Sequence, residues 1–510
     1  MYIFLNKDFL LNDIGELLKA FYPQEELFFF IKEDARSAAV SEKGAVLLTP
    51  VNNSSAREAA RILKERDGRG FKGKITPERV KNSNLGVLPD LEIMYSDTGV
   101  CIDGTCFEMA SDDKSRSRNE LKRALYQVLS GRTGRQLPWG SLTGVRPTKF
   151  PIDMYKKGCT EDEIRAFMRQ SFFTSDKKIE LSMGIAKREL EILRRLDLKG
   201  GFSLYVGIPF CPSRCFYCSF ASYPIDRYPH KAEGYIERLI EEMRRIASKR
   251  MDSRLCSVYV GGGTPTALSA TLLDRLLCAL DESFDMGGAY EYTVEAGRPD
   301  SLDSEKLEVL RRHRVSRISI NPQTMNDDTL RIIGRNHTSQ DIKRAFYMAR
   351  EAGFDNINMD IILGLPDEGI KEVSHTLDEI EALSPESITV HSLAVKRTAK
   401  LNMESERYSD YGMVNTGELV ELCADRCEEM GCLPYYMYRQ KNMKGNLENV
   451  GYAKKGREGI YNILMMEDIQ DIEAIGAGTV SKTILPSGRI DRRDSPKELE
   501  LFIGSSCKER

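Results

Sequence analysis

The sequence predicts an α/β protein built on a parallel sheet, with an α+β region before it and an α-rich region after it. From residue 202 to residue 394, apolar and β-branched runs alternate with helix-period segments. Such alternation is typical of right-handed strand–helix–strand units. Clusters of cysteine, glycine and polar residues directly follow several of the strand-like runs, where α/β folds place their functional sites. The length of 510 residues allows about two to four domains with sizeable cores.

The first region, residues 1–195, predicts a small α+β domain followed by a helical linker. The apolar runs, the hairpin and the helix-period segments that support this prediction cover residues 27–31, 45–48, 91–109, 119–129 and 175–196. Residues 57–81 are rich in Lys and Arg, but acidic residues interrupt them, so we expect a solvated helix face.

The second region, residues 200–400, carries six strand-like runs. They read FSLYVGIPF, SVYVGGGTP, EYTVEAG, RISINPQ, NINMDIILGLP and SITVHSLA. The helical segments between them are predicted at residues 232–249, 271–284, 304–313, 339–352 and 371–383. Periodicity alone does not decide whether the resulting sheet closes into a barrel.

The third region, residues 401–510, is predicted to be an α-rich extension that covers the substrate. Cys423 and Cys427 lie four residues apart on a predicted helix, with Cys432 after it. They could hold a second cluster, but the flanking Leu and Met residues favour ordinary core thiols. The glycines of IEAIGAGTVSK, residues 472–482, are expected to let that segment close over the mouth of the site.

Composition narrows the class of protein. The formal net charge of -3 gives no case for bulk nucleic-acid binding. The opening run MYIFLNKDFLLNDIGELL lacks a small-residue cleavage site, and no apolar run approaches membrane-spanning length. We therefore expect a cytoplasmic protein without a membrane span. The twelve cysteines, mostly scattered singly, are then expected to be reduced thiols.

Three cysteines form the most informative motif. Cys211, Cys215 and Cys218 follow the first strand-like run in YVGIPFCPSRCFYCSF. Thiolates at this CxxxCxxC spacing can each bind one iron of a four-iron cluster, which leaves the fourth iron open to a small molecule. A zinc site or part of a disulfide framework is the alternative. Zinc usually takes a fourth Cys or His, and no His lies between residues 203 and 229.

Further polar groups follow the other strands. After the second run comes a Gly-Gly-Gly-Thr-Pro turn at residues 261–265, whose glycines allow a close approach of backbone to a ligand. The later strands carry Glu295, Asn321, Gln323, Asp360 and His391. Buried carboxylates need partners, so Glu295 and Asp360 either belong to a functional cleft or form ion pairs with Arg298, Arg317 or Arg335. A single histidine in a strand is more often a satisfied core residue than a catalyst.

These motifs together resemble the radical S-adenosylmethionine enzymes. The narrower resemblance is to the oxygen-independent coproporphyrinogen III dehydrogenase group. It rests on YVGIPFC, GGGTPT, NPQTMN, GRNH, MDIILGLP and YRQKNMKGNLENVGY, and LPWGSLTGVRPTK near the front is similar to the HemZ-like branch. The resemblance covers residues 200–480 and implies a partial barrel of six strand–helix units, a 4Fe-4S cluster and S-adenosylmethionine as cofactors. It also implies a reduced flavodoxin- or ferredoxin-type electron donor.

The resemblance also implies roles for individual residues. Cys211, Cys215 and Cys218 would be the cluster ligands at the catalytic centre. The residues expected to surround S-adenosylmethionine are Tyr205, Gly262, Gly263, Thr264, Glu295, Gln323, Arg335, Asp360 and Ala394. The implied reaction removes hydrogen and carbon dioxide from the propionates of coproporphyrinogen III to leave vinyl groups.

Two positions depart from the dehydrogenase pattern. The chain has Phe220 where that group commonly has a further cysteine, and Gly207 where it commonly has His. Phenylalanine is typical of relatives that resemble heme chaperones, so a heme-binding protein and a radical enzyme acting on heme remain alternatives. In the first region, Trp139 and Arg146 would either help cover a porphyrin or anchor a domain interface.

Overall fold

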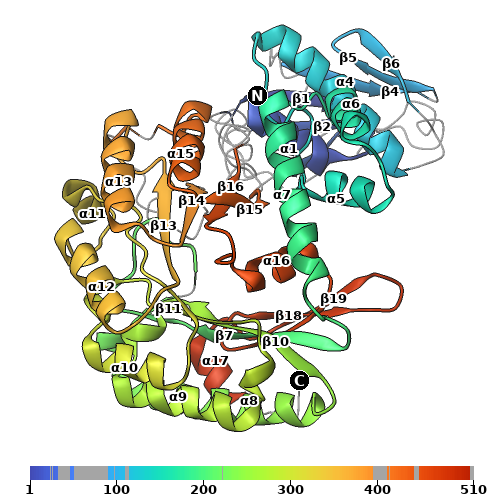
Figure 1. Ribbon diagram of the computed structural model, residues 1–510. Helices are drawn as coiled ribbons and strands as arrows, with labels where there is room; N and C mark the ends of the chain where they lie inside the picture. Colours follow the sequence, from blue (N-terminus) through green and yellow to red (C-terminus); the bar gives the residue numbers. More distant parts are fainter. Residues whose placement is uncertain are drawn as a thin grey trace, which may run out of the picture. The chain divides into compact units, whose positions relative to one another are not determined.

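The computed structural model describes residues 1–7, 9–22, 25, 27–32, 46–50, 90–96, 98–109, 114–220, 222–393, 411–412, 414–440 and 447–505 (Figure 1). The chain divides into two compact units. The first comprises Met1–Pro147, Met154–Glu180 and Gln440–Leu447, and the second comprises Thr148–Asp153, Leu181–Arg439 and Glu448–Arg510. The basic segment at residues 57–81 lies outside the described residues.

The first unit is an α+β fold around a six-stranded sheet with the order β3-β2-β1-β4-β5-β6. Its strands are β1 (Tyr2–Leu5), β2 (Phe28–Lys32), β3 (Val46–Pro50), β4 (Leu91–Tyr95), β5 (Gly99–Ile102) and β6 (Thr105–Glu108). Helices α1 (Leu11–Phe21) and α4 (Lys114–Thr133) bury apolar side chains, among them Leu17, Leu18, Leu121 and Leu125, in one core with the sheet. The predicted hairpin at residues 91–109 is thus a three-stranded meander.

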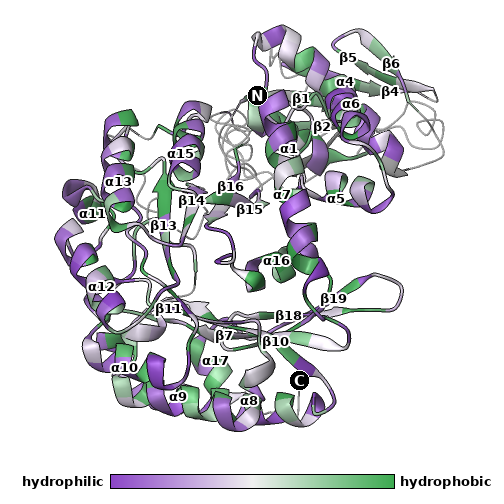
Figure 2. Ribbon diagram, viewed as in Figure 1, coloured by the Kyte–Doolittle hydropathy of each residue, from purple (hydrophilic) through white to green (hydrophobic). Residues whose placement is uncertain are grey.

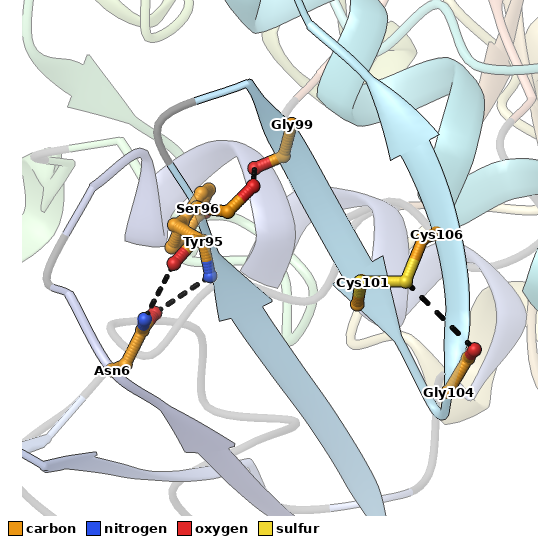
Figure 3. Close-up of a disulfide and its surroundings, with 7 residues drawn as sticks. All are labelled: Asn6, Tyr95, Ser96, Gly99, Cys101, Gly104 and Cys106. Atoms are coloured by element: carbon orange, nitrogen blue, oxygen red, sulfur yellow. Dashed lines mark hydrogen bonds between the residues drawn. A yellow bond between two sulfur atoms is a disulfide. The ribbon is translucent and has the colours of Figure 1, made fainter.

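A disulfide joins Cys101 and Cys106 in this meander (Figure 3). The expectation of reduced thiols is therefore wrong for this pair. Asp103 and Gly104 have φ angles of 47° and 80° and form a tight turn between β5 and β6. The two cysteines face each other directly across the strands, with their Cα atoms 3.9 Å apart. The Asp-Gly pair between them is a strong sequence signal for such a turn, and it could have revealed the pairing.

Three more helices follow, α5 (Lys149–Lys156), α6 (Glu161–Phe172) and α7 (Asp176–Arg194). A capping box starts α6, because Thr160 and Glu163 satisfy each other's backbone N–H groups. Trp139 is fully buried, so its ring offers no exposed face to a ligand, whereas Arg146 is half-buried.

The second unit holds an eleven-stranded sheet with the order β15-β16-β14-β13-β12-β11-β10-β7-β17-β18-β19. Its six central strands run parallel and are β7 (Gly201–Ile208), β10 (Arg254–Gly262), β11 (Glu291–Glu295), β12 (Arg317–Ser319), β13 (Ile357–Leu363) and β14 (Ser387–Ser392). The end strands β15 and β19 do not pair with each other, so the sheet is an open, partial barrel. The predicted α/β fold class is confirmed.

Helices cover the outside of this sheet in Figure 1. They are α8 (Pro229–Lys249), α9 (Ala270–Ser283), α10 (Ser304–Arg312), α11 (Asp327–Ile332), α12 (Ser339–Glu351) and α13 (Ile370–Leu383). Their amphipathic sequences explain this position: Figure 2 shows hydrophilic and hydrophobic segments alternating along them, and α9 buries Leu273, Leu276, Leu277 and Leu280. Ser269, Asp303 and Thr338 cap three of these helices with side-chain hydrogen bonds.

The C-terminal extension contains more strand than the prediction of an α-rich region allowed. It comprises α15 (Gly417–Glu429), β15 (Leu433–Tyr438), β16 (Asn449–Ala453), α16 (Ile460–Glu467), β17 (Asp471–Ile475), β18 (Val480–Ile484), β19 (Ile490–Asp494) and α17 (Leu499–Gly504). The segment 472–482, expected to close over the site, instead places β17 parallel to β7 in the sheet. Its apolar residues Ile472 and Ile475 are buried there, which a mobile cover would not provide. Among the described helices, none is long and apolar enough to cross a membrane.

Candidate active site

The three predicted cysteines lie on a loop at the carboxyl end of β7. The loop starts with the short strand β8 (Phe210–Cys211), which pairs with β9 (Tyr223–Pro224). Its middle is tied to the chain after α11: the Phe216 N–H donates to Ile333 O at 3.1 Å, and Ser213 Oγ donates to Gly334 O at 3.2 Å. The loop is therefore held at two points by another part of the barrel.

The thiols of this loop are shielded from solvent. Cys215 is buried, and Cys211 and Cys218 are half-buried. Burial raises the pKa of Cys211 to about 12 and raises the pKa of Cys218. Binding of a cationic metal group would favour the thiolates and offset the free energy needed to ionise buried thiols.

Arg298 is one of the cations beside the loop. It is 3% exposed, and its Nη1 donates to Ser213 O at 3.0 Å, to Ser213 Oγ at 2.8 Å and to Cys215 Sγ at 3.7 Å. Asp300 fixes the guanidinium by accepting hydrogen bonds from Nε and Nη2 at 2.9 and 2.5 Å. A buried cation at this sulfur stabilises negative charge on the loop, as an iron–sulfur cluster with thiolate ligands requires.

The glycine turn packs directly against the cysteine loop. Gly262 has a φ of 105°, which favours glycine. A Cβ at Gly263 would lie 2.6 Å from Phe210 O and 3.1 Å from Cys211 Sγ, so only glycine fits there. Thr264 follows with its Oγ1 donating to Cys211 Sγ at 3.5 Å. The turn therefore brings backbone and one hydroxyl to the first cysteine, as predicted for residues beside a cofactor.

Glu295 ends β11 next to the same turn. Its carboxylate accepts hydrogen bonds from Tyr259 Oη at 2.6 Å and from the Gly262 N–H at 3.2 Å. Burial raises the pKa of Glu295 to about 7, although both hydrogen bonds oppose the shift. Near neutral pH both forms of the carboxyl are therefore populated, and the ionised form can accept a ligand's ammonium group or hydroxyls.

Tyr205 lies beneath this carboxylate in a group of three stacked tyrosine rings. The centroid of Tyr205 is 6.1 Å from those of Tyr259 and Tyr461, and the latter two are 4.8 Å apart. The Tyr205 hydroxyl is 3.1 Å from the position that a Cβ would take at Gly262. Burial raises the pKa of Tyr205, so its hydroxyl remains protonated and can donate.

The strands β12 and β13 contribute a second group of predicted residues. Asp360 accepts a hydrogen bond from Asn358 Nδ2 at 2.7 Å and lies 3.7 Å from His391 Nε2. Its pKa is lowered: burial opposes the ionised form, but hydrogen bonding and charge from His391 and hydrogen bonds from neighbouring side chains outweigh burial. Gln323 bridges to Ile361 beside it and holds a φ of 66°, an uncommon angle for a residue other than glycine.

Arg335 is 7% exposed and anchors the strand ends to the cysteine loop. Its Nη1 donates to Asn321 O at 2.6 Å, and its Nη2 donates to Tyr217 Oη at 3.3 Å. The Nε atom of Arg335 is buried and has no hydrogen-bond partner in the described structure. A buried donor of this kind suits an anionic ligand group such as a carboxylate.

Glu295 and Asp360 do not belong to a structural network of ion pairs with these arginines among the described residues. Neither Glu295 nor Asp360 pairs with Arg298, Arg317 or Arg335 in that part of the chain. Arg317 lies at the opposite end of its strand and donates to Ser387 Oγ at 3.1 Å.

Ala394 lies outside the described residues. Cys423, Cys427 and Cys432 are fully buried core thiols.

Two residues of the site were missed from the sequence, Tyr259 and Tyr217. Tyr259 lies two residues before the glycine turn, in register with Tyr205 of the neighbouring strand. A tyrosine two residues before the glycine turn could have indicated a hydroxyl near the site. Tyr217 lies between two of the cysteines, and its role depends on Arg335, which is distant in sequence.

The two departures from the family pattern have distinct surroundings. Phe220 is 64% exposed, two residues beyond Cys218. Gly207 is packed against the β17–β18 connection, where a Cβ would lie 2.6 Å from Thr479 Cγ2. The contact leaves no room for the histidine common at this position without movement of Thr479.

The chain is similar to several known proteins. The model of the radical SAM superfamily matches residues 205–380. The oxygen-independent coproporphyrinogen-III oxidase-like protein HemZ of Bacillus subtilis (strain 168) is 40% identical over 390 residues, covering 76% of this chain and 78% of HemZ. The heme chaperone HemW of the same organism is 34% identical over 282 residues, covering 54% of this chain and 69% of HemW. The solved structure of coproporphyrinogen III oxidase (HemN) from Escherichia coli is 23% identical, with a TM-score of 0.47 over 59% of this chain and 68% of that chain.

Proposed function

Because the chain belongs to the radical SAM superfamily, in the group of oxygen-independent coproporphyrinogen-III oxidase-like proteins that includes HemZ, we propose that it oxidatively decarboxylates the propionates of coproporphyrinogen III to give protoporphyrinogen IX. The observation that carries the proposal is the meeting of the cysteine loop, the glycine turn and Glu295 at one edge of the sheet. Three thiols, a glycine backbone and a carboxylate are the groups that a cluster and S-adenosylmethionine need.

Each residue of the site has a proposed task. Cys211, Cys215 and Cys218 hold the cluster, and Arg298 balances the charge of Cys215. Glu295 accepts the ammonium group of S-adenosylmethionine, and the lowered pKa of Asp360 keeps it ionised as an acceptor for ribose hydroxyls. Arg335 offers its buried guanidinium to a carboxylate.

The cluster and S-adenosylmethionine, when bound, supply a carbon-centred radical that takes a hydrogen atom from the substrate. The propionate then loses carbon dioxide and one electron, which leaves a vinyl group. The electron needs an acceptor, and the initial reduction needs a donor of the flavodoxin or ferredoxin type. The chain's own part is to orient the reactants and to exclude water, and the buried Tyr461, stacked with the half-buried Tyr205 and Tyr259, supports this part.

The test is an anaerobic turnover assay. The reconstituted protein is supplied with reductant, S-adenosylmethionine and coproporphyrinogen III, and deoxyadenosine and protoporphyrinogen are measured together. We expect both products to form in step. Deoxyadenosine without the porphyrin product would retain the radical chemistry and reject the substrate.

Heme binding is the second candidate, and Phe220 is the observation that favours it. An exposed phenylalanine beside the cysteine loop offers an apolar face to a planar macrocycle. The similarity to the heme chaperone HemW points the same way. Stoichiometric heme uptake without deoxyadenosine would support the binding function. Deoxyadenosine formed only when heme is present would instead identify heme as the substrate of the radical chemistry.

A further inference from the structure

A cavity of about 610 Å³ lies in the second unit, at the edge of the sheet opposite the cysteine loop. Its lining includes Tyr290, Ser316 and Asn356, which immediately precede β11, β12 and β13. The strands are parallel, so these residues share the amino-terminal edge, whereas the cysteine loop and glycine turn share the carboxyl edge. The cavity is therefore separate from the proposed active site.

The acidic groups of this cavity are already engaged. Glu458 accepts hydrogen bonds from Arg188 at 2.7 and 3.1 Å, and Asp355 accepts one from Arg457 at 3.0 Å. Glu291 accepts a hydrogen bond from Thr293 Oγ1 at 2.6 Å and further bonds from two backbone N–H groups at the start of α16. Each of the three carboxylates therefore has a hydrogen-bond partner other than Arg311 and Arg314.

Arg311 and Arg314 are those remaining arginines. Within the part of the chain that the structure describes, neither forms an ion pair with a carboxylate, whereas Arg195 pairs with Glu191. The guanidinium of Arg311 lies over the ring of Phe354, 5.3 Å from its centroid. Two exposed cations three residues apart therefore line the cavity without a direct ion pair, and the charge of Asp355 acts on Arg311 from a longer distance.

The backbone of Arg314 has a conformation that favours glycine. Arg314 follows α10 with a φ of 57°, and the Val315 N–H donates to Leu310 O at 3.1 Å. Helices α12 and α15 end in the same hydrogen-bond pattern, but their left-handed residues are Gly353 and Gly431. Glycine is the residue that this position favours. Arginine in its place loses free energy of folding, as do Phe173, Ser384 and Asp468 at the ends of α6, α13 and α16, so glycine can replace Arg314 without backbone strain.

Asn356 also lines the cavity, and its Oδ1 atom is shielded from solvent and has no hydrogen bond in the described structure. Ile192, Leu196 and Val315 supply apolar wall. The volume falls within the range of small-molecule sites.

We propose that this cavity binds a small phosphorylated molecule, with Arg311 and Arg314 holding its phosphate. A phosphate dianion can accept from two guanidinium groups at once, whereas one carboxylate is satisfied by a single arginine. The site is distinct from the S-adenosylmethionine site and does not depend on the proposed reaction.

The test is calorimetric titration of the full-length, reconstituted protein with pyrophosphate and with ribose 5-phosphate. Both titrations are made with saturating S-adenosylmethionine, so that the acceptors proposed for its ribose are occupied and do not bind ribose 5-phosphate. Citrate is titrated in parallel as a polyanion without phosphate. The variant Arg314→Gly is decisive, because glycine fits the left-handed position and should leave the melting temperature equal or higher. We expect it to weaken binding by about tenfold or more.

The control variant is Arg492→Gln, which removes a positive charge on the exposed strand β19. Unchanged binding in this variant, together with weaker binding in Arg314→Gly and Arg311→Gln, would support the site. Equal binding of citrate would overturn the assignment of phosphate. Unchanged affinity in Arg314→Gly, or no binding of either phosphate probe, would overturn the site itself.

Discussion

The hydroxyl of Tyr259 donates a 2.6 Å hydrogen bond to the half-buried carboxylate of Glu295. The two residues lie on neighbouring parallel strands, β10 and β11, at the edge where the glycine turn approaches the cysteine loop. The bond favours the ionised carboxylate, and burial opposes it. Burial dominates, so the pKa of Glu295 is raised to about 7.

This balance predicts a pH-dependent difference in stability between the wild type and Glu295→Gln. The unfolded chain releases the proton near the ordinary value of 4.5, whereas the folded protein keeps it to about pH 7. The stabilising contribution of the protonated carboxyl is therefore complete below pH 4.5 and is lost as pH rises to about 7. We expect the melting temperature of the cofactor-free wild type to fall relative to Glu295→Gln across this range. Glu308→Gln, on the exposed side of α10, is the control, and parallel curves for wild type and Glu295→Gln would contradict the prediction.

Loss of one cysteine of the loop should abolish cluster binding completely. Cys215→Ala removes the buried thiol that Arg298 contacts, so the cluster loses one of its three ligands. We expect the brown chromophore and the cleavage of S-adenosylmethionine to fall to background. Absorption spectra and deoxyadenosine yield measure the two losses. Cys278→Ala changes an exposed thiol on α9 and should leave both intact. Retention of both properties in Cys215→Ala would exclude the cluster assignment.

Arg298 predicts a change in redox potential. Its buried guanidinium favours the more negatively charged, reduced cluster, so Arg298→Met should lower the midpoint potential. A shift of tens of millivolts is expected, because about 59 mV corresponds to a tenfold change for one electron. Redox titration followed by electron paramagnetic resonance measures it. Arg298→Lys keeps the charge and should restore part of the shift, and Arg331→Met on the exposed face of α11 should cause none. Equal potentials in all four proteins would contradict the prediction.

Much of the barrel could be predicted from its sequence, because each element carries its own periodic pattern. Helix α13 is expected at residues 371–383 and is observed at Ile370–Leu383, and α10 differs from its prediction by one residue at its end. Cys211, Glu295 and Asp360 could be assigned to one edge because parallel strands direct their carboxyl ends to the same side.

The features that could not be predicted depend on pairing between segments that are distant in the sequence, and a local sequence pattern does not encode such pairing. The glycines at residues 476 and 478 resemble a loop, yet the preceding residues pair with β7, more than 260 positions earlier. The hydrogen bond from Tyr259 to Glu295 likewise follows from strand register. The Cys101–Cys106 disulfide is a local feature, and the general expectation for scattered cysteines concealed it.

The contact between Gly207 and Thr479 predicts coupling between two substitutions. A Cβ at residue 207 would lie 2.6 Å from Thr479 Cγ2, so Gly207→Ala should destabilise the protein by about 1–3 kcal/mol through overpacking. Thr479→Ser removes that methyl group and keeps the hydroxyl that donates to Gly476 O at 2.9 Å. Gly207→Ala should therefore cost at least about 0.5 kcal/mol less in the Thr479→Ser background. Urea unfolding of the wild type, both single variants and the double variant gives this coupling energy.

The control for this cycle is Gly234→Ala on α8, where a Cβ would meet only one atom, at 4.0 Å. Alanine there should be neutral or slightly stabilising, because it favours the helix more than glycine does. Additive effects of Gly207→Ala and Thr479→Ser would show that Thr479 is not the obstacle at position 207. Coupled effects would show that the connection between β17 and β18 restricts position 207 to glycine. In that case the histidine common in the dehydrogenase group is excluded by the C-terminal extension of this chain.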